Sequence, residues 1–177
     1  PTQETPALPP RVSLHLPHVL PWSPPHPHLA HPADLPPAGL PIPIPGTLAI
    51  ASGWTLTAHL CAATDLPPDW RATLAPWTAY LDAAQVRQLH LTTPQAGMRL
   101  TPLGLDGHSK TLGNLFTDAK IHPTLRAGWP IVQAHPPQGA PFIAWVCGLA
   151  VGVQARLTAA TRQVVQLRWQ LRATPES

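Results

Sequence analysis

The chain has 177 residues, of which 11% are charged and 26 are prolines. This length suits one domain with an appendage, or two very small domains. The charge is uneven, because residues 1–85 hold two arginines against five acidic residues, whereas residues 86–177 hold nine basic residues against three acidic ones. A basic half favours a polyanionic partner. The sequence contains no run of 18 apolar residues and no visible signal peptide, which argues against a membrane span.

Residues 1–45 are expected to form an extended arm or linker. More than half of the prolines fall here, and proline lacks the N–H donor and clashes with the preceding helical turn. Polyproline II with local turns is therefore the expectation. Five histidines lie in this arm without nearby thiols or a carboxylate cluster, so we expect solvated imidazoles and no metal site: His15, His18, His26, His28 and His31.

Two cysteines, Cys61 and Cys147, lie in apolar runs without the CxxC spacing of a zinc site. Buried free thiols are expected, which fits a reducing cytoplasm. The chain opens PTQETP, with no initiator methionine, so we expect a fragment or a processed product.

Folded structure is expected to begin near Gly46. Residues 46–63, GTLAIASGWTLTAHLCAA, contain two β-type runs around Ser52-Gly53 and predict a hairpin. A turn-rich connection with a short helical stretch follows. The sequence QLHLTTP, residues 88–94, alternates with period two and predicts a strand. GMRLTPLGLDG, residues 97–107, predicts a strand broken by Pro102 and Gly104.

The strongest helical pattern follows residue 109. Ser109 is placed to cap the helix, and an apolar face recurs at Leu112, Leu115, Phe116 and Ala119. The helix is expected to stop at 121–122, before a short helical turn that starts at Pro123.

Strands are then predicted in PIVQA, FIAWVCGLAV, VQARLT and RQVVQLRWQL. The tryptophans are expected in the core, with Trp129 partly exposed. We therefore predict an α+β fold: a small antiparallel sheet with one main helix and a helical turn, preceded by the Pro-rich arm. The predicted segments are the arm (1–45), the hairpin and connection (46–77), and a C-terminal domain (78–177).

Catalytic motifs are scarce. GHSKT, residues 107–111, lacks the first glycine of a Walker loop. Asp106, His108 and Ser109 contain the residue types of a triad, but they are sequence neighbours and no GxSxG elbow is present. We predict no catalytic residue. Helix N-terminal amides with Lys110 are nevertheless suited to an RNA phosphate.

Several motifs occur in the order found in one known family. They are PLG at 102–104 with Lys110, LFTDAKI at 115–121, R-x-x-x-P at 126–130, IAWVCG at 143–148 and TRQVVQL at 161–167, preceded by AYLDA at 79–83. Over roughly residues 78–171 the chain resembles the C-terminal domain of bacterial tRNA(Ile)-lysidine synthetases. It departs from the family pattern at Met98, where an aspartate is usual, at Pro123, which is displaced by one residue, and in LHLTT, which lacks the usual arginine.

The resemblance implies a tRNA-recognition module of a ligase that attaches lysine to the wobble cytidine of tRNA(Ile) with ATP. The implied partners are tRNA(Ile), in its acceptor-stem region, and the enzyme's N-terminal catalytic domain, in the cytoplasm. The SGGxDS loop of that catalytic domain does not occur in these 177 residues, so the chain is expected to be inactive alone and to hold no cofactor. ATP and lysine are implied only as substrates of the whole enzyme.

Phosphate contacts need a few cations on a rigid surface. Our candidate RNA-binding residues are Lys110, Arg99, Lys120, Arg126, Ser109 and His108. A buried structural pair with Asp118 is the alternative role for Arg126. Two alternatives of other classes stay open: a protein-interaction or scaffolding domain without RNA binding, whose arm is a ligand for an aromatic groove, and a small enzyme using His108, Ser109 and Lys110.

Overall fold

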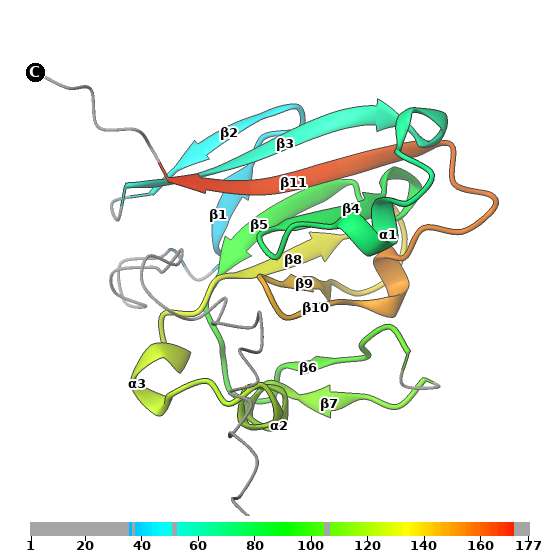
Figure 1. The fold of residues 1–177 in the computed structure, drawn as a ribbon. Coiled ribbons are helices and arrows are strands. Elements are labelled where there is room, and N and C mark those ends of the chain that lie inside the picture. The colour runs from blue at the N-terminus through cyan, green and yellow to red at the C-terminus, as the bar shows by residue number, and fades with distance from the viewer. Residues whose placement is uncertain (1–35, 37, 51–52, 105–106, 172–177) are drawn as a thin grey trace, which may run out of the picture.

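The computed structural model describes residues 36, 38–50, 53–104 and 107–171, and Figure 1 shows their arrangement. A five-stranded antiparallel sheet contains, in spatial order, β1 (Leu40–Ile42), β5 (Gln88–Thr92), β8 (Ile131–His135), β9 (Phe142–Val146) and β10 (Ala150–Val151). A four-stranded antiparallel sheet contains β2 (Gly46–Ala49), β3 (Trp54–Ala62), β11 (Gln163–Leu171) and β4 (Thr78–Asp82). A separate two-stranded ribbon pairs β6 (Arg99–Leu100) with β7 (Lys110–Thr111).

The helices are short. They are α1 (Trp70–Thr73), α2 (Leu112–Asp118) and α3 (Pro123–Arg126), with 3₁₀ turns η2 (Ala63–Asp65), η3 (Ala83–Gln85) and η4 (Val153–Ala155). Within the described residues, no helix has the length and apolar character needed to cross a bilayer.

The main core fills the space between the two sheets. Its fully buried side chains come from both sheets and include Leu56, Leu81 and Leu167 from one, with Leu89, Leu91 and Val132 from the other. The alternation of apolar and polar residues in β3 and β11 follows from this arrangement, since one face of their sheet is buried and the other is open to water.

A second core lies on the opposite face of the five-stranded sheet, where α2 and the ribbon cover it. Its sheet residues include Ile143 and Val146, which are three positions apart on β9. A regular strand would point them to opposite faces. The register shifts here, because Val132 pairs with Trp145 and Gln133 pairs with Ile143, leaving Ala144 as the extra residue of a bulge. The bulge therefore lets one strand supply two cores.

Structure begins earlier than expected. Residues 40–42, at the end of the predicted arm, form β1 and pair with β5. Pro41 fits there because an edge strand does not need every N–H group for pairing. Residues 1–35, which carry the five histidines of the arm, lie outside the described residues.

The α+β prediction is confirmed, with one main helix and a helical turn, although the strands divide between two sheets and a ribbon. The predicted hairpin is β2–β3. VQARLT, predicted as a strand, instead contains the 3₁₀ turn η4. The chain turns there because Val153 N donates to Thr101 O, while Ala155 N and Arg156 N donate within the turn.

Candidate nucleic-acid interface

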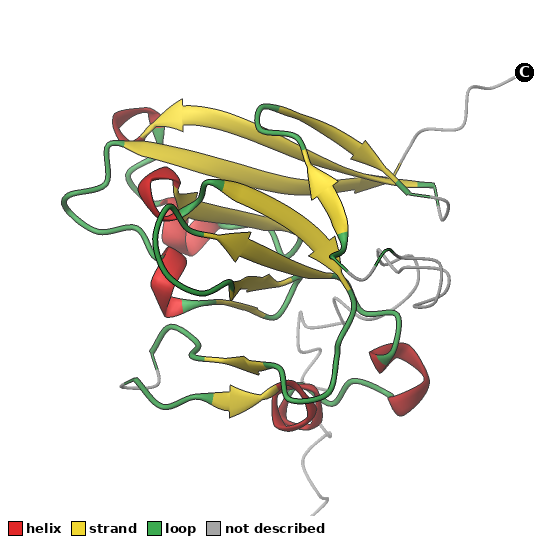
Figure 2. Cartoon of the chain, turned by 180° about the vertical axis from the view of Figure 1, so that it is seen from behind, coloured by secondary structure: helices red, strands yellow, loops and turns green. Residues whose placement is uncertain are grey.

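The predicted RNA-binding residues gather on one layer of the molecule. Arg99 lies on β6 and Lys110 on β7, Lys120 follows α2, and Arg126 ends α3. Figure 2 shows that the ribbon, α2 and α3 lie together on the side of the five-stranded sheet away from the four-stranded sheet. His108 and Ser109 immediately precede β7 and are exposed. Asp106, the third residue of the sequence triad, lies outside the described residues.

Arg99 and Ser109 close the ribbon. The Arg99 Nε donates to the Ser109 hydroxyl at 3.1 Å and its Nη2 donates to the Ser109 carbonyl at 3.2 Å. Ser109 therefore does not cap the helix, as the sequence had suggested. Thr111 is the N-cap, and its hydroxyl accepts a hydrogen bond from Asn114 N at 3.2 Å. The helix starts later because residues 110–111 are extended and pair with β6.

Lys110 forms an ion pair with Asp118. The two charged atoms lie 2.8 Å apart, and the side chains are 36% and 58% exposed. This contact joins the ribbon to the last residue of α2. The alternative role considered for Arg126, a pair with Asp118, is wrong, because among the described residues the Arg126 guanidinium donates to Ile121 and Thr117.

Arg126 joins α3 to α2 instead. Its Nε donates to the Ile121 carbonyl at 2.9 Å, and its Nη1 donates to the Thr117 hydroxyl at 3.3 Å. The Thr117 hydroxyl in turn donates to Gly113 O at 2.9 Å. The half-buried guanidinium thus satisfies a carbonyl just beyond the end of α2, where a cation is favourable.

Lys120 differs from these three cations. Its backbone adopts φ +56°, the one positive value recorded for a non-glycine residue in the described chain. Its side chain is exposed, and within that described chain no hydrogen bond or ion pair involves its ammonium.

The second core holds this layer in place. Phe116 and Trp129 are 2% and 1% exposed, and their rings meet edge to face with centroids 6.0 Å apart. Trp129 Nε1 donates to the Cys147 carbonyl at 2.9 Å. The expectation that Trp129 would be partly exposed is wrong, because this buried hydrogen bond lets the indole enter the core. Burial also raises the pKa of the Cys147 thiol.

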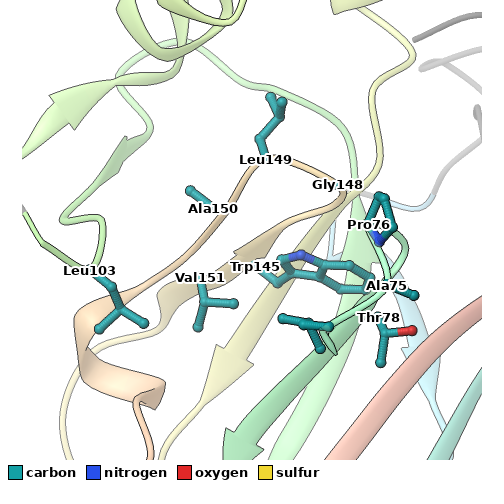
Figure 3. A pocket seen from close by; sticks show the side chains of 10 residues that line it. Ala75, Pro76, Thr78, Leu103, Trp145, Gly148, Leu149, Ala150 and Val151 are labelled. Carbon is teal, nitrogen blue, oxygen red and sulfur yellow. The ribbon is translucent and has the colours of Figure 1, made fainter. Parts of the chain in front are cut away.

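Two hollows of the surface are lined by residues other than these cations. An apolar hollow of about 340 Å³ has Trp145 in its lining, with Leu103 on one side and Ala75 and Pro76 on the other (Figure 3). A second, of about 510 Å³, is lined by Asp82, Arg156 and Thr158 among others. Asp82 is held there by structural hydrogen bonds from Thr161 and Ala84. In the described chain, no three His, Cys, Asp or Glu side chains come together as a metal site would require.

Two contacts were not anticipated from the sequence: the pairing of Asp118 with Lys110, and the hydrogen bond between Thr161 and Asp82. Lys110 and Asp118 are eight positions apart and meet only because a strand turns into a helix between them. Asp82 and Thr161 are 79 positions apart. Asp82 lies in the AYLDA motif and Thr161 in the TRQVVQL motif, both of which the sequence analysis compared with the family pattern. Their place in those motifs was the signal in the sequence that could have pointed to this contact.

Comparisons with known proteins agree with this architecture. Residues 89–169, from β5 to near the end of β11, match a family model described as "TilS substrate C-terminal domain". A search of curated proteins finds no match. A solved structure titled "Crystal structure of TILS C-terminal domain" aligns with a TM-score of 0.59 and 23% identity, covering 75% of this chain and 95% of that one. At this identity the structural match shows a shared fold.

Proposed function

We propose that this chain is the tRNA-recognition module of a tRNA(Ile)-lysidine synthetase, whose catalytic domain carries out the chemistry. Residues 89–169, which match the family model, would form its C-terminal domain. The proposed RNA is tRNA(Ile), bound in its acceptor-stem region. The proposed whole enzyme joins lysine to the wobble cytidine with ATP. In this proposal the chain supplies binding and not chemistry, and we assign no cofactor to it.

The observation that carries the proposal is the charge of one rigid layer. Four cations, Arg99, Lys110, Lys120 and Arg126, share the ribbon–α2–α3 layer with one described carboxylate, Asp118. Double-stranded RNA is recognised mainly by shape and by phosphate contacts. Such recognition needs cations at fixed positions, and hydrogen bonds and the second core hold this layer to the sheet.

An alternative function, a protein-interaction domain, is favoured by one feature. Leu103 is 49% exposed and borders the apolar hollow of about 340 Å³. Exposed apolar surface of this kind suits a protein partner. The two functions differ in their salt dependence, because phosphate binding releases counterions and apolar docking does not.

The test is tRNA binding measured by fluorescence anisotropy across a potassium chloride series. We expect salt-dependent binding that is stronger for tRNA(Ile) than for an unrelated tRNA. The double variant Lys110→Gln/Lys120→Gln removes two charges without removing the hydrogen bonds of Arg99 and Arg126. It should flatten the salt slope by one to two units, at roughly one unit for each lost phosphate contact.

Arg168→Gln is the matched control. Arg168 is exposed on β11, in the four-stranded sheet at the other side of the molecule. The Arg168→Gln variant should leave the salt slope of tRNA binding unchanged. Absence of salt-dependent binding to either tRNA would overturn the proposal in favour of protein interaction, and an equal effect of Arg168→Gln would place the RNA elsewhere.

A further inference from the structure

The end of α2 is closed by two backbone hydrogen bonds that require a left-handed residue. Ile121 N donates to Phe116 O at 2.8 Å, and Lys120 N donates to Thr117 O at 3.0 Å. With Ala119 as the C-cap, this is the Schellman pattern, and Lys120 stands where glycine is usual. A side chain at φ +56° is strained, because its Cβ approaches the backbone.

No hydrogen bond or ion pair of the Lys120 side chain, within the residues that the structure describes, offsets this strain. The Lys120 side chain is exposed, and its ammonium has no hydrogen-bond or ion-pair partner in the described part of the chain. Backbone strain in a native protein is a reason to look for function at that residue. A lysine here points to a contact made outside the chain.

The other predicted cations are already engaged. Arg99 donates to Ser109, Lys110 pairs with Asp118, and Arg126 donates to a carbonyl and a hydroxyl. A phosphate would compete with those partners for their donors. A phosphate at Lys120 would displace no hydrogen bond or ion pair of the described residues.

The position of Lys120 is also fixed. Its neighbour Ile121 is 1% exposed, and Phe116, which accepts the closing hydrogen bond from Ile121, is 2% exposed. Both belong to the second core. The backbone that carries the lysine is therefore anchored to the interior, and preorganisation of this kind strengthens a contact.

We propose that Lys120 is the principal phosphate-contacting cation of this layer, and that it occupies a helix end where stability alone would favour glycine. The inference rests on the proposed RNA-binding function and names the residue that contributes most to it. The ligand class is the RNA sugar-phosphate backbone, approached at the junction of α2 and α3.

The test separates stability from binding in one variant of the full chain, Lys120→Gly. Relief of strain should leave the melting temperature unchanged or raise it by about 1–4 °C. Binding of tRNA(Ile) near 0.1 M salt should weaken about five- to tenfold, and the salt slope should fall by roughly one unit. Lys120→Arg should keep most of the binding, because it keeps the charge. Lys110→Ala, the matched control, should change the slope by less than half as much.

The possible failures are distinguishable. If the unmodified chain shows no salt-dependent tRNA binding, the proposed function and this inference both fall. If the unmodified chain binds and Lys120→Gly binds with the same affinity and slope, only this inference falls. A lower melting temperature for Lys120→Gly would also overturn it, since the lysine would then serve the helix end. An equal loss of tRNA affinity for Lys110→Ala would also overturn the inference, because Lys120 would then not be the principal contact.

Discussion

Replacing Thr161 by valine should destabilise the domain through a single buried hydroxyl. Thr161 is 7% exposed, and its hydroxyl donates to Asp82 Oδ2 at 2.8 Å while accepting from Thr158 N at 2.9 Å. Asp82 is 6% exposed, and its other oxygen accepts from Ala84 N at 3.0 Å. Valine fills nearly the same volume but leaves a buried carboxylate with one partner fewer.

The expected cost follows from the type of bond. A hydrogen bond to a charged group contributes about 1.5–3 kcal/mol. The free energy of unfolding should fall by that amount, and the melting temperature by roughly 5–15 °C for a domain of this size. Urea unfolding followed by tryptophan fluorescence measures the change, with the slope m unchanged.

Serine at position 161 is the control, because Thr161→Ser keeps the hydroxyl and removes only a methyl group. It should recover most of the stability lost in Thr161→Val. The reasoning is refuted if Thr161→Val lies within about 0.5 kcal/mol of the unmodified chain. It is also refuted if serine and valine are equally destabilising, because the loss would then reflect packing.

Two further predictions concern charge. A double-mutant cycle of Lys110→Ala and Asp118→Ala should give a coupling energy of about 0.2–1 kcal/mol that vanishes in high salt, because both side chains are partly open to solvent. A coupling energy unchanged by salt would contradict this. The pKa of His90 is lowered from 6.5 by burial and then by neighbouring His135. The unfolded chain therefore binds more protons than the folded chain, so the free energy of unfolding should decrease as the pH is lowered from about 7 to about 5. His90→Gln should flatten that fall in urea midpoints; an unchanged slope would refute the assignment.

The periodicity of apolar residues correctly predicted the buried face of the main helix and one central strand. Leu112 and Phe116 are buried as the helical spacing indicated, and the period-two alternation of 88–94 predicted β5. The first and last residues of α2 were harder to predict from the sequence. Its start is set by ribbon pairing of residues 110–111, and its end by a left-handed Lys120, where no glycine marks the cap.

Long-range pairing and the partners of charged groups could not be read locally. The sequence placed the candidate cations in one segment, and the structure brings them to one layer. Their partners depend on which strand pairs with which, so Asp118 was considered for Arg126 and is bound by Lys110. Trp129 precedes a proline, which suggested a loop, but its burial depends on a carbonyl 18 positions away.

The place of β11 bears on how this protein is made. β11 lies between β3 and β4, and Gln163 pairs with Ala62, roughly 100 residues earlier. A ribosome working at about 5–20 residues per second therefore takes about 5–20 s to produce the partner of β3. During that time β3 has an unpaired side with apolar residues, the kind of edge that recruits other chains. Translation speed and chaperone supply should consequently affect the yield of this protein.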